Sequence, residues 1–181
     1  MPTNWTSGWR PAAANPESVL MELVTATEEH LRTLMNWLPD ERACLQWGGP
    51  AFRYPFSEQT FLQDCRWTEL PSYRLVDDNG TTLAFGQYYR RLDRCHLGRL
   101  IVSPAHRGAG VGRTLVTELI RCGCADLGVG ECSLFVLKDN TVAKALYGKL
   151  GFEFAHYPGS AEWLEVCDYM VAPAEVFTRY G

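Results

Sequence analysis

The chain has 181 residues, of which 46% are hydrophobic, 12% are aromatic and 21% are charged, and its net charge at pH 7 is −4. This length and apolar content predict one globular domain with a sizeable core, carrying at most a small appendage. No apolar run approaches the roughly 18 residues of a membrane-spanning helix, residues 1–16 lack the apolar stretch of a secretory signal, and the acidic balance argues against a nucleic-acid binder.

The first third of the chain is expected to be helical. Thr25 and Glu28 have the spacing of a capping box, and apolar residues then recur at helical spacing until Pro39. Glycines and prolines predict that residues 44–56 form a loop. A second helix is expected over residues 57–66, because Ser at its start can cap it.

After these helices the pattern changes to strands that alternate with two further helices. Strands are expected over residues 73–77, 82–90, 95–102, 133–137, 152–157 and 163–171, and helices over 110–124 and 140–150. This order predicts an α+β fold with a mixed, mostly antiparallel central sheet flanked by helices. The domain is expected to span residues 21–172, between an N-terminal arm (1–20) and a C-terminal tail (173–181).

Charge and cysteine content add two weaker expectations. Residues 1–90 carry the whole net charge of −4, which could attract a cationic partner such as an amine or could be an ordinary solvated surface. Of the seven cysteines, only Cys122 and Cys124 are close in sequence, and no second pair or nearby His completes a metal site. The sequence therefore predicts reduced thiols, no metal and a cytoplasmic location.

The segment between the third expected strand and the helix that follows carries the strongest chemical signal. It reads Arg107-Gly108-Ala109-Gly110-Val111-Gly112-Arg113. Glycines let backbone N–H groups approach a ligand closely, and the helix start and Arg107 add positive charge. These features predict a phosphate or pyrophosphate site, although a tight turn between strand and helix is the alternative. The pattern fits neither a Walker loop nor a dinucleotide-binding loop.

Two signatures together resemble the GNAT superfamily of N-acetyltransferases, and the loop with Trp47-Gly-Gly-Pro and Tyr54-Pro-Phe resembles its bacterial, single-domain members. The first is Arg107-x-x-Gly110-x-Gly112, and the second is Asn140-x-x-Ala143-x-x-Leu146-Tyr147-x-x-x-Gly151-Phe152. They occur in the expected order with a strand between them. The resemblance covers roughly residues 21–172 and implies the GNAT fold, with acetyl-CoA as co-substrate and no metal.

The resemblance also implies which residues contact acetyl-CoA. The backbone of one strand would pair with the pantetheine arm and direct an N–H at the thioester oxygen, and the glycine-rich segment would bind the pyrophosphate. Asn140 would contact the cofactor or cap the last helix. The expected contacts are Leu100, Ile101, Val102, Arg107, Gly108, Ala109, Gly110, Val111, Gly112, Arg113, Asn140 and Tyr147.

Two catalytic roles follow from the resemblance. Tyr147 would stand near the CoA sulfur and protonate the departing thiolate, although a Tyr packed on the sheet is the alternative. His96 occupies a position where many members have a Glu that acts as the general base, but it could also be an ordinary, partly buried His. Strand alternation predicts that His96 shares a face with Leu100 and Val102. Glu69 and Glu22 are alternative candidates for the base, without motif support.

The acceptor site is less sharply marked. Residues 47–56 fall where GNAT enzymes form the acceptor wall, so Trp47, Phe52 and Tyr54 are candidate contacts, although these aromatics could instead belong to the core. Tyr88 is a further candidate, and because Tyr88 and Tyr89 alternate faces, one of the two should face the cleft.

A basic cluster surrounds the turn between the second and third expected strands. Its members are Arg90, Arg91, Arg94 and Arg99. The cluster could bind an acceptor carboxylate or a CoA phosphate, or it could be a solvated turn.

Taken together, the sequence predicts an N-acetyltransferase that moves acetyl from acetyl-CoA directly to a primary amine of a small molecule or peptide. A homodimer is possible, and no nucleic acid or membrane is expected as a partner. The alternative is a non-catalytic, acyl-CoA-binding module with the same fold.

Overall fold

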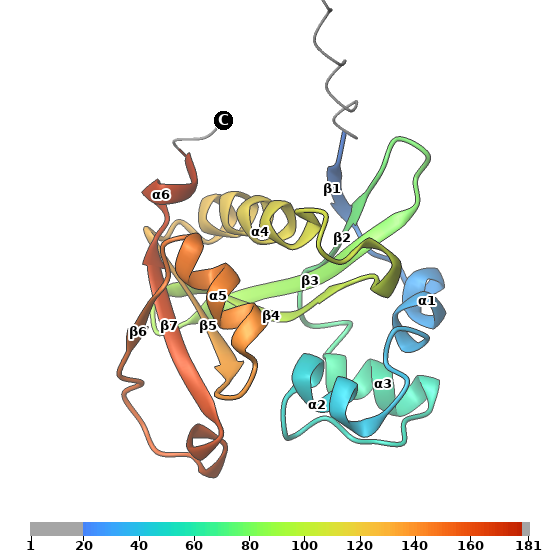
Figure 1. Ribbon diagram of the computed structural model, residues 1–181, viewed down its shortest axis with the longest axis horizontal. Helices are drawn as coiled ribbons and strands as arrows, with labels where there is room; N and C mark the ends of the chain where they lie inside the picture. Colours follow the sequence, from blue (N-terminus) through green and yellow to red (C-terminus); the bar gives the residue numbers. More distant parts are fainter. Residues whose placement is uncertain (1–19, 179–181) are drawn as a thin grey trace, which may run out of the picture.

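The computed structural model describes residues 20–178 (Figure 1). In chain order its elements are β1 Glu22–Thr25, the 3-10 helix η1 Glu28–His30, α1 Leu31–Met35, α2 Glu41–Gly48, α3 Glu58–Cys65, β2 Ser72–Val76, β3 Thr82–Arg91, β4 Arg94–Val102, η2 Pro104–His106, α4 Val111–Leu127, β5 Glu131–Leu137, α5 Thr141–Lys149, β6 Glu153–Ala155, η3 Glu162–Glu165, β7 Cys167–Pro173 and α6 Glu175–Thr178. The strands form one sheet in the order β1-β2-β3-β4-β5-β7-β6. Only the β4–β5 pair is parallel within this sheet, which confirms the predicted mixed, mostly antiparallel α+β fold.

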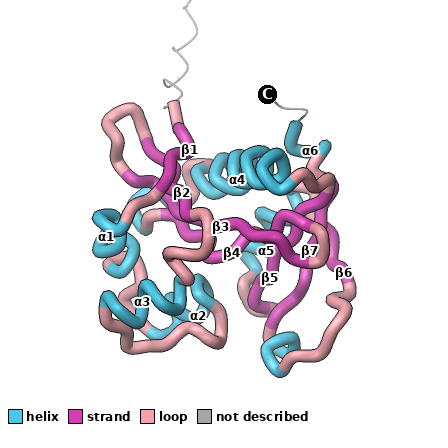
Figure 2. The backbone as a smooth tube through the Cα atoms, turned by 180° about the vertical axis from the view of Figure 1, so that it is seen from behind, coloured by secondary structure: helices cyan, strands magenta, loops and turns pink. Residues whose placement is uncertain are grey.

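Helices cover both faces of the sheet. Along β3, Ala84 and Tyr88 pack in the core beneath α4 and α5, whereas Phe85 packs in a second core with α1, α2 and α3. Figures 1 and 2, which view the molecule from opposite sides, both show α1, α2 and α3 grouped at one end of the sheet, apart from α4. The period-2 alternation of β3 thus divides the apolar residues between two cores.

The N-terminal helices differ from the sequence prediction in two ways. Residues 44–56 are not wholly a loop, because α2 runs from Glu41 to Gly48. Asp40 caps this helix by accepting a hydrogen bond from the Ala43 N–H. The helix ends only at its C-cap, Gly49, whose φ is 80°. The first cap is Thr27 rather than Thr25. The prediction gave too much weight to glycines and prolines that begin only where α2 ends.

The last part of the chain also differs from the prediction. Trp163 lies in η3 rather than in a strand, and β7 begins only at Cys167. Beyond residue 172 the chain stays packed on the domain, because Phe177 is 3% exposed and its ring lies 5.9 Å from that of Phe152. The predicted arm, residues 1–20, lies outside the described residues except for Leu20.

Candidate active site

The two parallel strands at the centre of the sheet pair over only part of their length. Cys95, His96 and Leu97 of β4 pair with the start of β5, and the pairing stops at Leu97 and Leu134. Beyond this point the two strands run apart (Figure 1). The facing edge of β4 therefore has no strand partner in β5 beyond Leu97, and its free backbone groups can hydrogen-bond to a ligand with an extended chain.

A β-bulge in β4 decides which side chains face this gap. The register with β3 shifts so that Gln87 lies opposite Gly98 but Phe85 lies opposite Ile101, and Arg99 takes a φ of 53°. The extra residue reverses the alternation.

Side chains on either side of the bulge consequently lie on different faces. Leu100 and Val102 pack under α4, whereas His96 lies on the other face, against the rings of Tyr89 and Phe135. The prediction that His96, Leu100 and Val102 share a face is wrong, because strict alternation holds only in a strand without a bulge.

The glycine-rich turn leads directly into α4. Gly108 and Gly110 have φ values of 79° and 82°, and Gly110 is the N-cap of the helix. The N–H groups of Val111 and Gly112 precede the first helical hydrogen bonds, so they lack an acceptor within the helix. Arg107 is exposed and its Nε donates to the carbonyl of Val102 at the end of β4. The arrangement fits an anion at the helix start.

Helix α5 lies close to the start of α4. A Cβ on Gly112 would be 3.3 Å from the side chain of Leu146, so the two helices approach through a glycine. Asn140 caps α5 by accepting a hydrogen bond from the Ala143 N–H, which is one of the two roles expected for it. Tyr147 follows Leu146 and is buried, and burial raises the pKa of its phenol to about 12. The phenol is therefore protonated at neutral pH.

An open cavity of about 270 Å³ lies between α2 and the diverging strands. Trp47 forms part of its wall, and the indole Nε1 donates to the carbonyl of Arg99 at 2.7 Å. The same ring stacks on Phe61 with centroids 5.1 Å apart. Trp47 thus packs in the core and also lines the cavity, so the two roles that the sequence offered as alternatives, core packing and a place at the acceptor site, are compatible.

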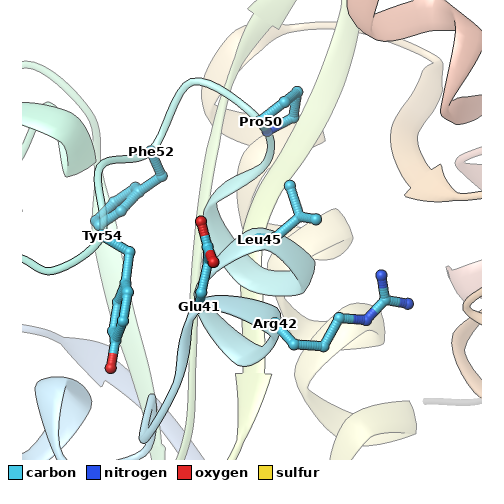
Figure 3. Close-up of a pocket in the computed structure, with 6 residues that line it drawn as sticks. All are labelled: Glu41, Arg42, Leu45, Pro50, Phe52 and Tyr54. Carbon is cyan, nitrogen blue, oxygen red and sulfur yellow. The ribbon is translucent and has the colours of Figure 1, made fainter.

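The other expected acceptor residues do not line this cavity. Phe52 and Tyr54 line a second hollow of about 270 Å³ on α2, where Figure 3 shows them on one side of Glu41, with Leu45 and Arg42 on the other. The Tyr54 hydroxyl donates to the carbonyl of Pro39.

Tyr88 lies on the opposite face of the sheet. Its hydroxyl contacts that of Tyr73 at 3.1 Å and donates to Asp126 at 3.2 Å, beneath α4. The structure therefore contradicts the expected contact of Tyr88 with the acceptor. Of the two neighbouring tyrosines, Tyr89 is the one that lines the cavity.

His96 lines the cavity but is only 2% exposed. Its Nδ1 lies 2.9 Å from the Ser133 hydroxyl, and burial, together with the nearby charge of Arg91, lowers its pKa to about 3. Such an imidazole is neutral at pH 7 and is a weak proton acceptor. Its environment therefore does not favour the role of general base.

Two residues of the cavity wall were not predicted. Phe135 comes from β5 and Trp163 from η3, and their rings meet at 4.5 Å in an edge-to-face contact. They line the same cavity as Trp47, which comes from α2. No spacing in the sequence marks them, because each belongs to a different element.

The family model "Acetyltransferase (GNAT) family" matches residues 27–152, and the chain belongs to this family. The family match and the shared fold confirm the predicted family and fold class. Within residues 20–178, no group of three or more His, Cys, Asp or Glu side chains is placed to hold a metal. No helix in the same range is both long and apolar enough to cross a membrane.

Curated relatives match only part of the chain. A mycothiol acetyltransferase of Catenulispora acidiphila is 51% identical over 51 residues, which are 28% of this chain and 16% of that protein. One from Kytococcus sedentarius is 36% identical over 84 residues, covering 45% of this chain and 28% of that protein. The chain thus matches less than a third of the length of either relative.

Solved structures share the fold over most of the chain. The spermidine N-acetyltransferase of Vibrio cholerae, in complex with CoA and spermine, has a TM-score of 0.66 at 17% identity and covers 87% of this chain and 98% of its own. The ribosomal-protein-S18-alanine N-acetyltransferase of Escherichia coli has a TM-score of 0.61 at 24% identity, covering 86% and 94%. These likenesses show the fold.

Proposed function

We propose that this chain transfers the acetyl group of acetyl-CoA directly to a primary amine of a small molecule or peptide. The observation that carries the proposal is the gap between β4 and β5, bordered by the glycine-rich turn before α4 and by the α5 helix that bears Tyr147. Acetyl-CoA supplies the acetyl group as an activated thioester. The structural neighbour with bound CoA and spermine shares this fold and supports the same use of it.

The residues around the gap fit the parts of acetyl-CoA. The open edge of β4, from Leu100 to Val102, offers backbone groups to the pantetheine arm. The turn from Gly108 to Gly112 offers N–H groups and the positive end of α4 to the pyrophosphate. Arg107 adds a full positive charge beside the turn.

Tyr147 holds the proton that the departing thiolate needs. Its phenol is buried and burial raises its pKa to about 12, so the phenol keeps its proton at neutral pH and is available as a donor. Burial also destabilises the anion of a thiolate that leaves beside it, which favours transfer of the proton as the C–S bond breaks. We therefore assign the general-acid role to Tyr147.

The amine must reach the thioester without its proton. For a free amine with a pKa of about 10.4, losing the proton at pH 7 costs about 5 kcal/mol. Because His96 is a weak proton acceptor, we do not assign this step to it. We propose that the amine loses its proton to water as it enters the cavity, because burial there disfavours the ammonium form.

The proposal predicts the effect of Tyr147→Phe. The variant keeps the ring that packs 5.8 Å from Phe152 but has no proton to donate, so kcat should fall about 100-fold with CoA affinity unchanged within about twofold. Thiol release from acetyl-CoA measures kcat, and calorimetry measures CoA binding. Tyr88→Phe is the matched control, because Tyr88 is also a buried tyrosine beneath α4 and should keep its turnover.

The same assay tests the proposed function as a whole. Thiol release that depends on an added amine, with acetylated amine as product, supports an N-acetyltransferase. Tight CoA binding without product from any amine would instead indicate the non-catalytic, acyl-CoA-binding module. Unchanged turnover in Tyr147→Phe would remove Tyr147 from the mechanism. A cytoplasmic location and a homodimer stay predictions.

A further inference from the structure

The charge of the cavity is one-sided. Its lining includes two arginines, Arg91 and Arg99, and no Asp, Glu or Lys among the described residues. None of the ion pairs within residues 20–178 involves either arginine. The cavity is therefore positively charged, although the chain as a whole carries −4.

The four arginines that form a cluster in the sequence separate in the structure. Arg90 pairs with Asp93, and Arg94 pairs with Glu131 at 2.9 Å. These two are neutralised by carboxylates outside the cavity. Arg91 and Arg99 remain at its wall without an ion pair, although the Asp64 carboxylate acts on Arg99 through space.

Arg99 is committed to the protein itself. One terminal nitrogen donates to the side-chain oxygen of Gln87 at 3.0 Å, and the other donates to the backbone carbonyl of Asp64 at 2.5 Å. Its guanidinium therefore fixes the bulged segment of β4. It contributes charge to the cavity, with two of its five N–H donors engaged by the protein and its Nε buried without a partner.

Arg91 keeps its donors available. Its guanidinium carbon lies over three aromatic rings, at 5.5 Å from Tyr89, 5.2 Å from Phe135 and 5.8 Å from Tyr157. One weak hydrogen bond, 3.4 Å long, joins it to the Tyr157 hydroxyl. A guanidinium has five N–H donors, so most of those on Arg91 can serve a planar anion. The rings hold the group in place without neutralising it.

We propose that the acceptor is an amine that also bears a carboxylate, such as an amino acid or a derivative of one, and that Arg91 binds this carboxylate. The inference rests on the proposed function. A polyamine would bring further positive charge to a cavity that already holds two guanidinium groups, with no acid to compensate it. Trp47, Phe135 and Trp163 give the cavity an aromatic wall, which suits an amino acid with an apolar or aromatic side chain.

Positive charge in the cavity also serves the reaction. A cation beside a bound amine disfavours its ammonium form and lowers its pKa. The same two arginines that attract the carboxylate thus help the amine to lose its proton, in a site where His96 is a weak base.

The test compares matched acceptors. Phenylalanine, phenylalanine amide and phenethylamine share the aromatic ring and the primary amine but differ in the carboxylate, and spermidine represents the polyamines. We expect kcat/KM for phenylalanine to exceed that for the amide and for phenethylamine by about tenfold or more, since charge-assisted hydrogen bonds would be lost. The amide loses its ammonium proton more readily, so this preference would not arise from proton loss.

Variants assign the preference to Arg91. Arg91→Gln should abolish it, and Arg91→Lys should keep part of it because the charge remains but the planar fork does not. Arg90→Gln is the matched control on the same strand, because Arg90 donates instead to the carbonyl of Leu127 at the end of α4. CoA affinity, measured by calorimetry, shows that each variant is folded.

Three results would overturn the inference while leaving the proposed function intact. These are equal use of the acid and the amide, a preference for spermidine, and an unchanged preference in Arg91→Gln. If no amine gives product, the proposed function fails instead, and binding of phenylalanine to the CoA-saturated protein decides the inference. Binding that weakens about tenfold in Arg91→Gln would support it, and equal or absent binding would overturn it.

Discussion

Burial decides what His96 can do. Its ring is 2% exposed and lies between those of Tyr89 and Phe135, with Nδ1 2.9 Å from the Ser133 hydroxyl. Charging the imidazole there would place a cation in an apolar environment near Arg91, which is why its pKa falls to about 3 from the ordinary 6.5. The residue is therefore neutral in the folded protein across the physiological range.

This burial predicts a pH dependence of stability. Below pH 6.5 the unfolded chain takes up a proton at His96, whereas the folded protein takes up none there until about pH 3. The contribution of His96 to the free energy of unfolding is therefore fully present above pH 6.5 and falls as the pH falls. Between pH 6.5 and 5.0 the loss is about 2 kcal/mol, at about 1.36 kcal/mol per unit.

Urea denaturation of the wild type and of His96→Gln at pH 7.0 and 5.0 measures this contribution. Gln can still hydrogen-bond to Ser133 but does not titrate, so the wild type should lose about 2 kcal/mol more than the variant. An equal loss in both proteins would mean that His96 gains its proton without unfolding. The turnover of the variant should fall less than about tenfold, because loss of a true general base costs 100-fold or more.

At the scale of the element, the start of α4 depends on its glycines. Gly110 has a φ of 82°, a left-handed backbone conformation that residues other than glycine adopt at a cost of roughly 1–2 kcal/mol. The same residue is the N-cap of α4, where the N–H groups of Val111 and Gly112 lack an acceptor within the helix. We therefore expect backbone conformation and CoA binding to be coupled at Gly110.

Gly110→Ala tests this coupling against a matched glycine. Gly80, in the turn between β2 and β3, has a φ of 77°, and an added Cβ would meet nothing within 4 Å at either position. Both alanine variants should lose about 1 kcal/mol of unfolding free energy. Only Gly110→Ala should weaken CoA binding, by about tenfold, because displaced N–H groups lose charge-assisted hydrogen bonds. Denaturation and calorimetry measure the two quantities, and equal CoA binding by both variants would contradict the prediction.

At the scale of the whole molecule, the domain uses chain beyond the part that the family signatures cover. The family match ends at residue 152, yet Phe177 of α6 is 3% exposed and packs in the same core as α4. The predicted boundary at residue 172 would have left this ring outside the domain. The C-terminal segment therefore completes the core on the α4 face.

Substitutions of two phenylalanines in the last third of the chain test whether the C-terminal segment belongs to the core. Phe177→Ala removes a buried ring and should cost about 3–5 kcal/mol of unfolding free energy. Phe154→Ala on β6 is the matched control, because Phe154 is 62% exposed and contacts the Lys144 ammonium at 5.3 Å from its ring centre. Its loss should cost less than about 1 kcal/mol. Urea denaturation measures both, and a cost below about 1 kcal/mol for Phe177→Ala would show that the domain ends earlier.

Local chemistry made much of this protein predictable from its sequence. Glycines at positions of positive φ, such as Gly108 and Gly110, and a cap such as Asn140 act through their own backbone and immediate neighbours. The order of strands and helices follows from hydrophobic period in the same way. The sequence therefore predicted the fold class, the glycine-rich turn and the position of Tyr147 on a helix.

The faces and walls of the candidate site were decided only by tertiary structure. The bulge at Arg99 placed His96 on a different face from Leu100. Hydrogen bonds from Arg99 to Gln87 and Asp64, which are distant in sequence, hold this bulge. Phe135 of β5 and Trp163 of η3 meet at the cavity wall, where Arg91 of β3 has no ion pair within residues 20–178. Burial and charge compensation depend on residues that meet only in the folded chain, so periodicity along one strand could not predict them.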